Sequence, residues 1–429
     1  MITTYLHYIS DKFHAAGLWI GIGFFLLPMA AAAQDVDEEQ MEAALFLQEG
    51  DSVLTPDSVA LPWPQSAQTR IAKLLESELF ETSQLGLMVY DLDADSAIFC
   101  HGERQLLRPA STMKLLTAIT AIDRLGGDYQ FRTELCYTGS IDNGTLTGDI
   151  YCVGGFDPRF NIDDMKAFAE SIRKMGVDTI RGRLFADTGM KEDNPFGEGW
   201  CWDDDNPTLS PLLIGGKDRF MERFEEELRE TGMVVQTTTG KAVRPEGAFC
   251  ICRRFHTIDQ VLMRMMKDSD NLYAESMFYQ IAASTGDRPA KAAGAKDIIR
   301  RLIRKTGLEP DRYAIADGSG LSLYNYVSAE LEVAFLRYAF RNGNIYLHLH
   351  PSLPQAGMDG TLQNRMKGTF TRGNVYAKTG TLTGVSSLAG YCTAANGHRL
   401  AFAIINQGVM RSRNAKNFQD RVCEALCQP

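Results

Sequence analysis

The chain has 429 residues, of which 45% are hydrophobic and 10% aromatic, so it can bury a large core, and its length predicts two or three domains. This composition excludes a chain that is disordered over most of its length. The formal net charge of -10 and the lack of a Lys/Arg block argue against a general nucleic-acid-binding protein, which needs clustered cationic surface.

The first segment has the order of a secretory signal peptide. Lys12 precedes the apolar run 15–27, and the small residues 30–33 follow. An uncleaved membrane anchor is the alternative, because the apolar run is almost long enough to cross a bilayer. We expect 1–33 to be a signal peptide, 34–64 to be an acidic, Pro-containing extension, and the protein to be exported to the periplasm or cell envelope.

The folded body is expected to open with a helix and a strand. Apolar positions recur at helical spacing from 66 to 80, and 85–92 reads as a strand. The next helix has an apolar face, begins at Ser111 and ends at the glycine pair that starts with Gly126. Ser111 is therefore predicted at the N-terminus of a buried helix.

The middle of the chain has a different character. It combines Asp/Gly turns and two polar helices with short strands at 147–153 and 183–185. We interpret 134–250 as an inserted domain, or domains, between two parts of one catalytic domain, 65–133 and 251–429.

The last part of the chain alternates helices with apolar strands, which predicts an α+β layered core. Helices are expected at 258–266, 272–283, 292–306, 329–341 and 412–427. Strands are expected at 375–378, 386–392 and 400–406. His348 and His350 alternate on an apparent strand, but no third ligand is placed with them, so no metal site is expected.

The nine cysteines have neither the density nor the even count of a disulfide scaffold. Cys250 and Cys252 are separated by one residue, and Cys423 and Cys427 by one helical turn, and neither spacing matches a structural zinc site. Most are expected to be small buried hydrophobic side chains. Their pairing stays open.

Three short motifs follow one another along the chain. They are Ser111-Thr112-Met113-Lys114, Ser269-Asp270-Asn271 and Lys378-Thr379-Gly380-Thr381. Each is too short to be specific alone. In this order they are similar to the S-x-x-K, S-D-N and K-T-G set of penicillin-binding proteins and serine β-lactamases.

The first motif has the parts of an activated nucleophile. Lys114 lies one helical turn after Ser111 on the same face, where its amine can contact the hydroxyl. A serine hydroxyl needs a neighbouring base, and a lysine can serve only when neutral. Burial and a second cation, Lys378, are expected to lower the pKa of Lys114.

The other two motifs are expected to complete the site. Ser269 is a candidate proton relay to the leaving amine, and Asn271 a hydrogen-bond partner of the substrate and of Lys114. Asp270, between them, is expected to point away.

The K-T-G segment is expected to continue a strand. Gly380 leaves room for a peptide along that edge, with Thr379 and Thr381 beside it. The backbone N–H groups of Ser111 and Thr381 are expected to form the oxyanion hole.

The resemblance becomes closer when longer segments are compared. The sequence resembles the D-alanyl-D-alanine carboxypeptidase/endopeptidase family, the class C low-molecular-mass penicillin-binding proteins or peptidase family S13. Six segments in family order carry it: 108–133, 148–158, 269–275, 317–322, 353–365 and 377–391.

That resemblance implies a transpeptidase/β-lactamase-like core, an antiparallel sheet flanked by helices, with an insert between the first and second motifs. It implies a serine D,D-carboxypeptidase that forms an acyl-enzyme on Ser111, needs no cofactor, and acts on peptidoglycan stem peptides, with cleavage of cross-links as an additional activity. β-Lactam antibiotics are then expected to be covalent inhibitors. The oligomeric state stays open.

Two alternatives remain. One is a serine β-lactamase, but a class A enzyme uses a water-activating glutamate downstream of S-D-N, and no E-x-x-L-N-like segment follows that motif here. The other is a non-catalytic wall-binding homologue, which would have lost at least one catalytic residue. All five candidate catalytic residues are present: Ser111, Lys114, Ser269, Asn271 and Lys378.

The sequence also departs from the family pattern. Leu323 stands where the family has a basic residue after the 317–322 segment, and the insert is shorter than in larger members. Gly318-Ser319-Gly320 is not a G-x-S-x-G nucleophile elbow and is expected to form a tight turn beside the cleft.

Overall fold

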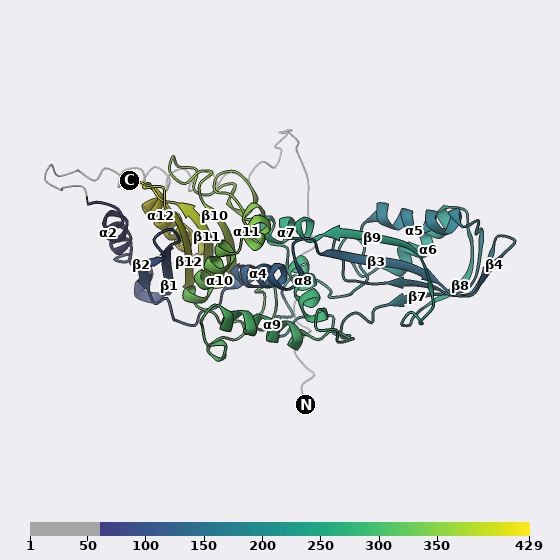
Figure 1. The fold of residues 1–429 in the computed structure, drawn as a ribbon. Helices are drawn as coiled ribbons and strands as arrows, with labels where there is room; N and C mark the ends of the chain where they lie inside the picture. The colour runs from purple at the N-terminus through teal and green to yellow at the C-terminus, as the bar shows by residue number, and fades with distance from the viewer. Residues whose placement is uncertain (1–60) are drawn as a thin grey trace, which may run out of the picture. The chain divides into compact units, whose positions relative to one another are not determined.

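The structure is a computed structural model that describes residues 61–429 (Figure 1). The expected signal peptide, 1–33, and most of the expected extension, 34–64, lie outside the described residues. Within residues 61–429, none of the helices combines the length and the apolar composition that a bilayer crossing requires.

The first sheet is antiparallel and five-stranded, in the order β10-β11-β12-β1-β2. Its strands are β1 (Gln84–Asp91), β2 (Ser96–His101), β10 (Tyr376–Leu382), β11 (Val385–Thr393) and β12 (Arg399–Gln407). The first strand pairs with the last, so that Val89 lies opposite Phe402. The strands expected here are confirmed, and β10 runs past residue 378 to include the whole K-T-G motif.

Helices cover both faces of this sheet because its central strands are apolar on both sides. On β12, Ile404 packs in a buried cluster with α2 (Gln65–Leu74) and α12 (Ser412–Cys427). The next residue, Ile405, packs in a second cluster with α4 (Met113–Leu125) and α10 (Ala329–Arg341). Successive strand residues point to opposite faces, so two layers of helices are needed. The expected α+β core, an antiparallel sheet flanked by helices, is confirmed.

Other helices surround α4. They are α7 (Ile258–Lys267), α8 (Asn271–Ala283), α9 (Ala292–Lys305) and α11 (Gly343–Ser352). Helix α8 is buried from Leu272 to Ala282, so it lacks a polar face. Three short 3-10 turns, η1 (Ala110–Thr112), η2 (Pro310–Arg312) and η3 (Gly360–Leu362), complete this part.

Two local expectations outside the insert were wrong. The single helix expected over 66–80 is divided into α2 and a short α3 (Leu79–Thr82), and the turn between them lets Phe80 pack edge-on against Phe418. His348 and His350 lie on α11 rather than on a strand.

The reason for the second error lies in the burial pattern of α11. Its buried residues Ile345 and Leu349 are four apart, a helical spacing that the alternation of Leu and His concealed. His348 Nδ1 lies 2.6 Å from Asp259 Oδ1, whereas the His350 ring packs on Tyr376. The two histidines therefore have different partners.

The region interpreted as an insert contributes most of a second, mixed sheet in the order β4-β5-β7-β6-β3-β9, with β8 beside β7. Its strands are β3 (Gln130–Tyr137), β4 (Ser140–Asp142), β5 (Thr145–Thr147), β6 (Ile150–Val153), β7 (Thr179–Asp187), β8 (Val234–Lys241) and β9 (Phe249–Thr257). Two helices, α5 (Ile162–Lys174) and α6 (Phe220–Glu230), share a buried cluster with it. The strand expected over 147–153 is interrupted at Gly148, where a Cβ would lie 1.9 Å from the Thr138 carbonyl oxygen.

Part of the insert packs with the rest of the chain. Phe156, Leu209 and Leu213 belong to the buried cluster that contains α4 and α8. The indole N–H of Trp200 donates to Asp317 Oδ2 at 2.8 Å. The second sheet therefore has a core of its own, while the loops that leave it share the first core.

Candidate active site

Ser111 lies in the 3-10 turn η1, directly before the regular helix α4. The preceding residue, Ala110, has φ +49°, a left-handed conformation that is uncommon for a residue with a Cβ. This sharp turn leaves Ser111 only partly buried, and Lys114 follows in the first turn of α4. Lys114 Nζ lies 3.0 Å from Ser111 Oγ, within hydrogen-bond distance.

The Lys114 side chain is fully buried among polar partners. Its Nζ donates to Asn271 Oδ1 at 2.7 Å and to the Ser319 carbonyl oxygen at 2.8 Å. Burial lowers the pKa of Lys114 to about 8, although nearby carboxylates, Asp317 first, act in the opposite direction. A base must be neutral to accept a proton, and this pKa makes a neutral amine accessible near neutral pH.

The S-D-N motif brings its first and third side chains into this site. Ser269 has φ +60°, and Asn271 begins α8 and reaches Lys114. Asp270 points away, as expected: its carboxylate accepts the backbone N–H of Tyr273 and pairs with Arg264 at 2.9 Å. Asp270 thus caps the helix that carries Asn271.

Lys378 connects the third motif to the second. Its Nζ donates to Ser269 Oγ and to the Thr379 carbonyl oxygen, both at 2.8 Å. Burial, with the Lys114 charge as a second cause, lowers the pKa of Lys378 well below its usual value. Burial, which was expected to lower the pKa of Lys114, is the main cause of the shift at both lysines, whereas the expected contribution of the Lys378 charge to the shift at Lys114 is not found.

Gly380 is held against the backbone of Ser111. A Cβ added there would lie 2.1 Å from Ser387 Oγ and 2.9 Å from the Ser111 backbone nitrogen. Only glycine allows β10 to approach Ser111 so closely. Of its neighbours, Thr379 donates its hydroxyl to Thr361 Oγ1 at 2.8 Å, and Thr381 is exposed at the strand edge.

The 317–322 loop supplies the carbonyl that binds Lys114. Asp317 Oδ1 accepts the N–H of Gly320 at 2.8 Å. Glu275, on α8, accepts the N–H groups of Gly318 and Ser319 at 3.0 and 2.7 Å. Burial, and then the Asp317 carboxylate, raises the pKa of Glu275 to about 8. The expected tight turn beside Ser111 is confirmed, and the two buried carboxyl groups hold it.

The 317–322 loop keeps a contact at its end although Leu323 replaces the basic residue of the family pattern. The Arg108 Nε donates to the Leu323 carbonyl oxygen at 3.0 Å, a contact that does not depend on the side chain at position 323. Neither this contact nor the roles of Glu275 and Asp317 were predicted. Both carboxyl residues lie in segments that carry the family resemblance, 269–275 and 317–322, but only the fold shows that the segments meet.

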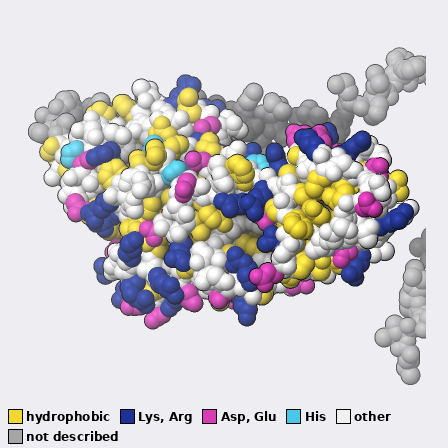
Figure 2. Space-filling model, turned by 45° about the vertical axis from the view of Figure 1, so that its right-hand side comes forward, with side chains coloured by type: hydrophobic (Ala, Val, Ile, Leu, Met, Phe, Trp, Pro, Cys, Tyr) yellow, Lys and Arg dark blue, Asp and Glu magenta, His cyan; other side chains and the backbone are white. Residues whose placement is uncertain are grey.

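A cavity of about 1110 Å³ lies away from these groups. It borders the C-terminal end of α4 at Leu125, whereas Ser111 precedes the N-terminal end. None of the motif residues lines it; its basic lining residues are Arg132, Lys191, Lys241 and Arg288. Lys and Arg side chains also gather around a hollow in the middle of the face drawn in Figure 2. Ser111 and Lys114 lie at the opposite, N-terminal end of α4.

Several known proteins are similar to this chain. D-alanyl-D-alanine carboxypeptidase DacB of Haemophilus influenzae is 26% identical over 434 residues, which cover 80% of this chain and 89% of that protein. The crystal structure of penicillin-binding protein 4 (DacB) from the same organism superposes with a TM-score of 0.76 at 23% identity, over 82% of this chain and 97% of that one. A second crystal structure of that protein, in complex with a β-lactam, has a TM-score of 0.71 at 24% identity and covers 84% of this chain and all (100%) of that one.

The family model gives the widest coverage. The model of the D-Ala-D-Ala carboxypeptidase 3 (S13) family matches residues 67–212 and 215–428, which include the three motifs, the 317–322 loop and most of the insert. With the motifs joined by hydrogen bonds around Ser111, the chain belongs to the D-Ala-D-Ala carboxypeptidase 3 (S13) family.

Proposed function

We propose that this chain is a serine D,D-carboxypeptidase that removes the terminal D-Ala from peptidoglycan stem peptides, with Ser111 as the nucleophile and without a cofactor. The contact between Lys114 Nζ and Ser111 Oγ, 3.0 Å, carries the proposal. It is supported by the partners of the two lysines, because Asn271 contacts Lys114 and Ser269 contacts Lys378.

Acylation begins when neutral Lys114 accepts the hydroxyl proton of Ser111. The oxygen then forms a bond to the carbonyl carbon of the penultimate D-Ala, and the N–H groups of Ser111 and Thr381 stabilise the negative charge on the carbonyl oxygen. When the C–N bond breaks, the departing amine takes a proton through Ser269, which Lys378 supports. Water then hydrolyses the ester and restores the Ser111 hydroxyl.

The substrate lies along β10 in this proposal. That strand is at the edge of the sheet, where an extended peptide can add main-chain hydrogen bonds. Gly380 carries no side chain that would block it, and Thr379 and Thr381 flank it as substrate-binding residues. Cleavage of cross-links would use the same groups on a longer substrate.

Penicillin is expected to acylate the same serine and to remain attached. A class A β-lactamase uses a glutamate that activates the deacylating water. Glu275, a carboxyl residue close enough to influence the pKa of Lys114, is fully buried and already accepts two backbone N–H groups. This arrangement favours a peptidase over a β-lactamase.

The organisation of the chain completes the proposal. Residues 1–33 direct export to the periplasm or cell envelope, and 34–64 form an extension. The catalytic domain comprises 65–133 and 251–429, and 134–250 is the insert.

Mass spectrometry of the intact protein after incubation with penicillin tests the function. We expect one stable adduct on the peptide that contains Ser111 and no adduct on Ser111→Ala. Ser96→Ala, at an exposed position of β2, is the matched control and should be acylated normally.

Turnover of synthetic substrates then separates the alternatives. A stem peptide that ends in D-Ala-D-Ala should release D-Ala, and a cross-linked dimer measures the endopeptidase activity. Persistent turnover by Ser111→Ala would refute the acyl-serine mechanism. Rapid multiple turnover of a chromogenic cephalosporin would support a β-lactamase instead.

A further inference from the structure

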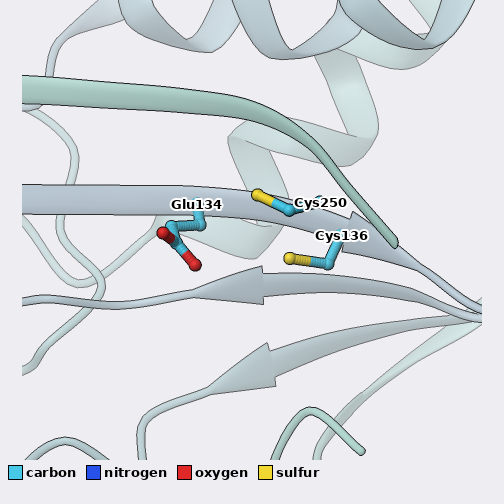
Figure 3. A group of neighbouring side chains, drawn as sticks. All are labelled: Glu134, Cys136 and Cys250. Carbon is cyan, nitrogen blue, oxygen red and sulfur yellow. The ribbon is translucent and has the colours of Figure 1, made fainter. Parts of the chain in front are cut away.

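Two thiols and a carboxylate lie together on the insert, away from Ser111. Glu134 and Cys136 are on β3, Cys250 is on β9, and their ligand atoms lie within 4.8 Å of one another (Figure 3). The sulfur atoms of Cys136 and Cys250 are side by side, on neighbouring strands and directed to the same side (Figure 3).

The strand register accounts for this placement. Cys136 lies directly opposite Cys250 in the antiparallel pair β3–β9. Residues opposite each other in such a pair have Cα atoms about 4.5–5.5 Å apart. Disulfides span Cα separations of about 4.4–6.8 Å, so the backbone already has a suitable spacing.

An irregularity in the strand register places Cys250, rather than Cys252, next to Cys136. Leu135 lies opposite Cys252 and Cys136 opposite Cys250, so β9 has one extra residue between the two pairs. Without it, residues 250 and 252 would share one face of the sheet. With it, Cys252 packs with Leu135 in the core beneath α5, while Cys250 joins Cys136 on the other face.

The charges around the cluster oppose a metal ion. Arg244 Nη1 lies 3.2 Å from one oxygen of Glu134 and 3.5 Å from Cys136 Sγ. Arg253 Nε lies 2.8 Å from the other oxygen. A cation would have to displace two guanidinium groups to reach a site with three protein ligands, whereas a disulfide leaves both ion pairs intact.

We propose that Cys136 and Cys250 form a cross-strand disulfide in the functional protein. Both thiols are oxidised: each loses a proton and together they give up two electrons as the S–S bond forms. The electrons and protons reduce the disulfide of an oxidant, either a thiol–disulfide oxidoreductase or oxidised glutathione, to two thiols. Because Cys250 is exposed and Cys136 is buried, the oxidant first forms a mixed disulfide at Cys250, which Cys136 then resolves.

The bond would join the two strands through which the chain enters and leaves the insert. It would close the loop from 136 to 250 and limit how far the second sheet can open when the chain unfolds. Its role is therefore to fix the insert, and the inference does not depend on the chemistry at Ser111.

Peptide mapping of the full chain after treatment with oxidised glutathione tests the proposal. Free thiols are alkylated before digestion without reduction. Trypsin leaves Cys250 and Cys252 in one peptide, and Cys136 and Cys152 in another. A second digestion with chymotrypsin after Tyr137 and Tyr151 separates the latter two, and Cys252→Ser removes the ambiguity in the former.

We expect a cross-linked species, lighter by two hydrogen atoms than the two thiol peptides together, in the wild type and in Cys252→Ser. It should be absent from Cys250→Ser. The wild type should melt at a higher temperature oxidised than reduced, and Cys250→Ser should lose this difference while penicillin still acylates it. Complete alkylation of Cys136 and Cys250 after oxidation would overturn the proposal. So would a stoichiometric zinc ion that protects both thiols.

Discussion

In the proposed mechanism, the protonation state of Lys114 decides whether Ser111 can react. Only the form of Lys114 that has lost its proton can act as the base. Burial lowers the pKa of Lys114 to about 8, so the fraction of this form increases as the pH rises toward that value. We expect the rate of acylation by penicillin to rise about tenfold per pH unit below pH of about 8 and to level off above it. The rate is measured from the adduct fraction at successive times and pH values.

Lys114→Arg is the comparison for this pH profile. Its guanidinium keeps the charge but cannot lose a proton in this range, so acylation should fall by about 10²–10⁴-fold at every pH. If the wild type reacted at the same rate from about pH 6 to about pH 9, Lys114 could not be the base.

The close packing of Gly380 leads to a second prediction for a single residue. In Gly380→Ala, the new Cβ would meet Ser387 Oγ at 2.1 Å and the Ser111 nitrogen at 2.9 Å, so β10 must move away from the nucleophile. Losing one aligned oxyanion donor costs about 10²–10³-fold in rate, and we expect acylation to slow by that amount. Gly343→Ala, where a Cβ meets nothing within 4 Å, should acylate at the wild-type rate. Equal rates for the two variants would contradict the proposed close approach.

The sequence allowed the proposed reacting groups to be named, but not the groups that position them. Ser111, Lys114 and Asn271 are in short motifs whose spacing predicts their neighbours, and the structure brings them within hydrogen-bond distance. Glu275 and Asp317 act through backbone N–H groups of a loop distant in sequence. Such contacts leave no periodic pattern, so sequence reasoning found the segments and missed the function of their carboxyl groups.

At the scale of elements, the start of α8 sets the position of Asn271. Asp270 caps this helix through the N–H of Tyr273. We expect Asp270→Ala to lower the free energy of unfolding by about 1 kcal/mol and Asp270→Asn to lower it much less, because asparagine is an equally good N-cap. Denaturant-induced unfolding measures both. Equal decreases in the free energy of unfolding for the two variants would indicate that the exposed ion pair with Arg264, rather than the helix cap, stabilises the protein.

Helices and central strands could be predicted where burial imposes a regular spacing of apolar residues. The predictions failed where burial imposes no such spacing. The β12 strand, buried on both faces, was expected nearly as it is. The strands β3 and β9 were not expected, because β9 is exposed along much of its length and has an inserted residue in its register. A pattern with period two cannot survive such a shift.

At the scale of the whole molecule, the expected insert and the expected catalytic domain share part of one buried core. The change in sequence character suggested an insert over 134–250, but it could not show that Phe156 and Leu213 lie in the buried cluster around α4. These residues are apolar in either context, and only the topology assigns them to one core. The shared core predicts that a substitution in the expected insert alters the acylation of Ser111.

Trp200 is the sharpest test of that prediction. Its indole N–H donates to Asp317, which holds the loop whose Ser319 carbonyl binds Lys114. Trp200→Phe keeps most of the ring but leaves a buried carboxylate without this partner, which costs about 1.5–3 kcal/mol of stability. We expect slower acylation by penicillin as well as a lower free energy of unfolding. Trp202→Phe, two residues away and 93% exposed, should change neither quantity. If both variants acylated like the wild type, the insert would not influence the site through this hydrogen bond.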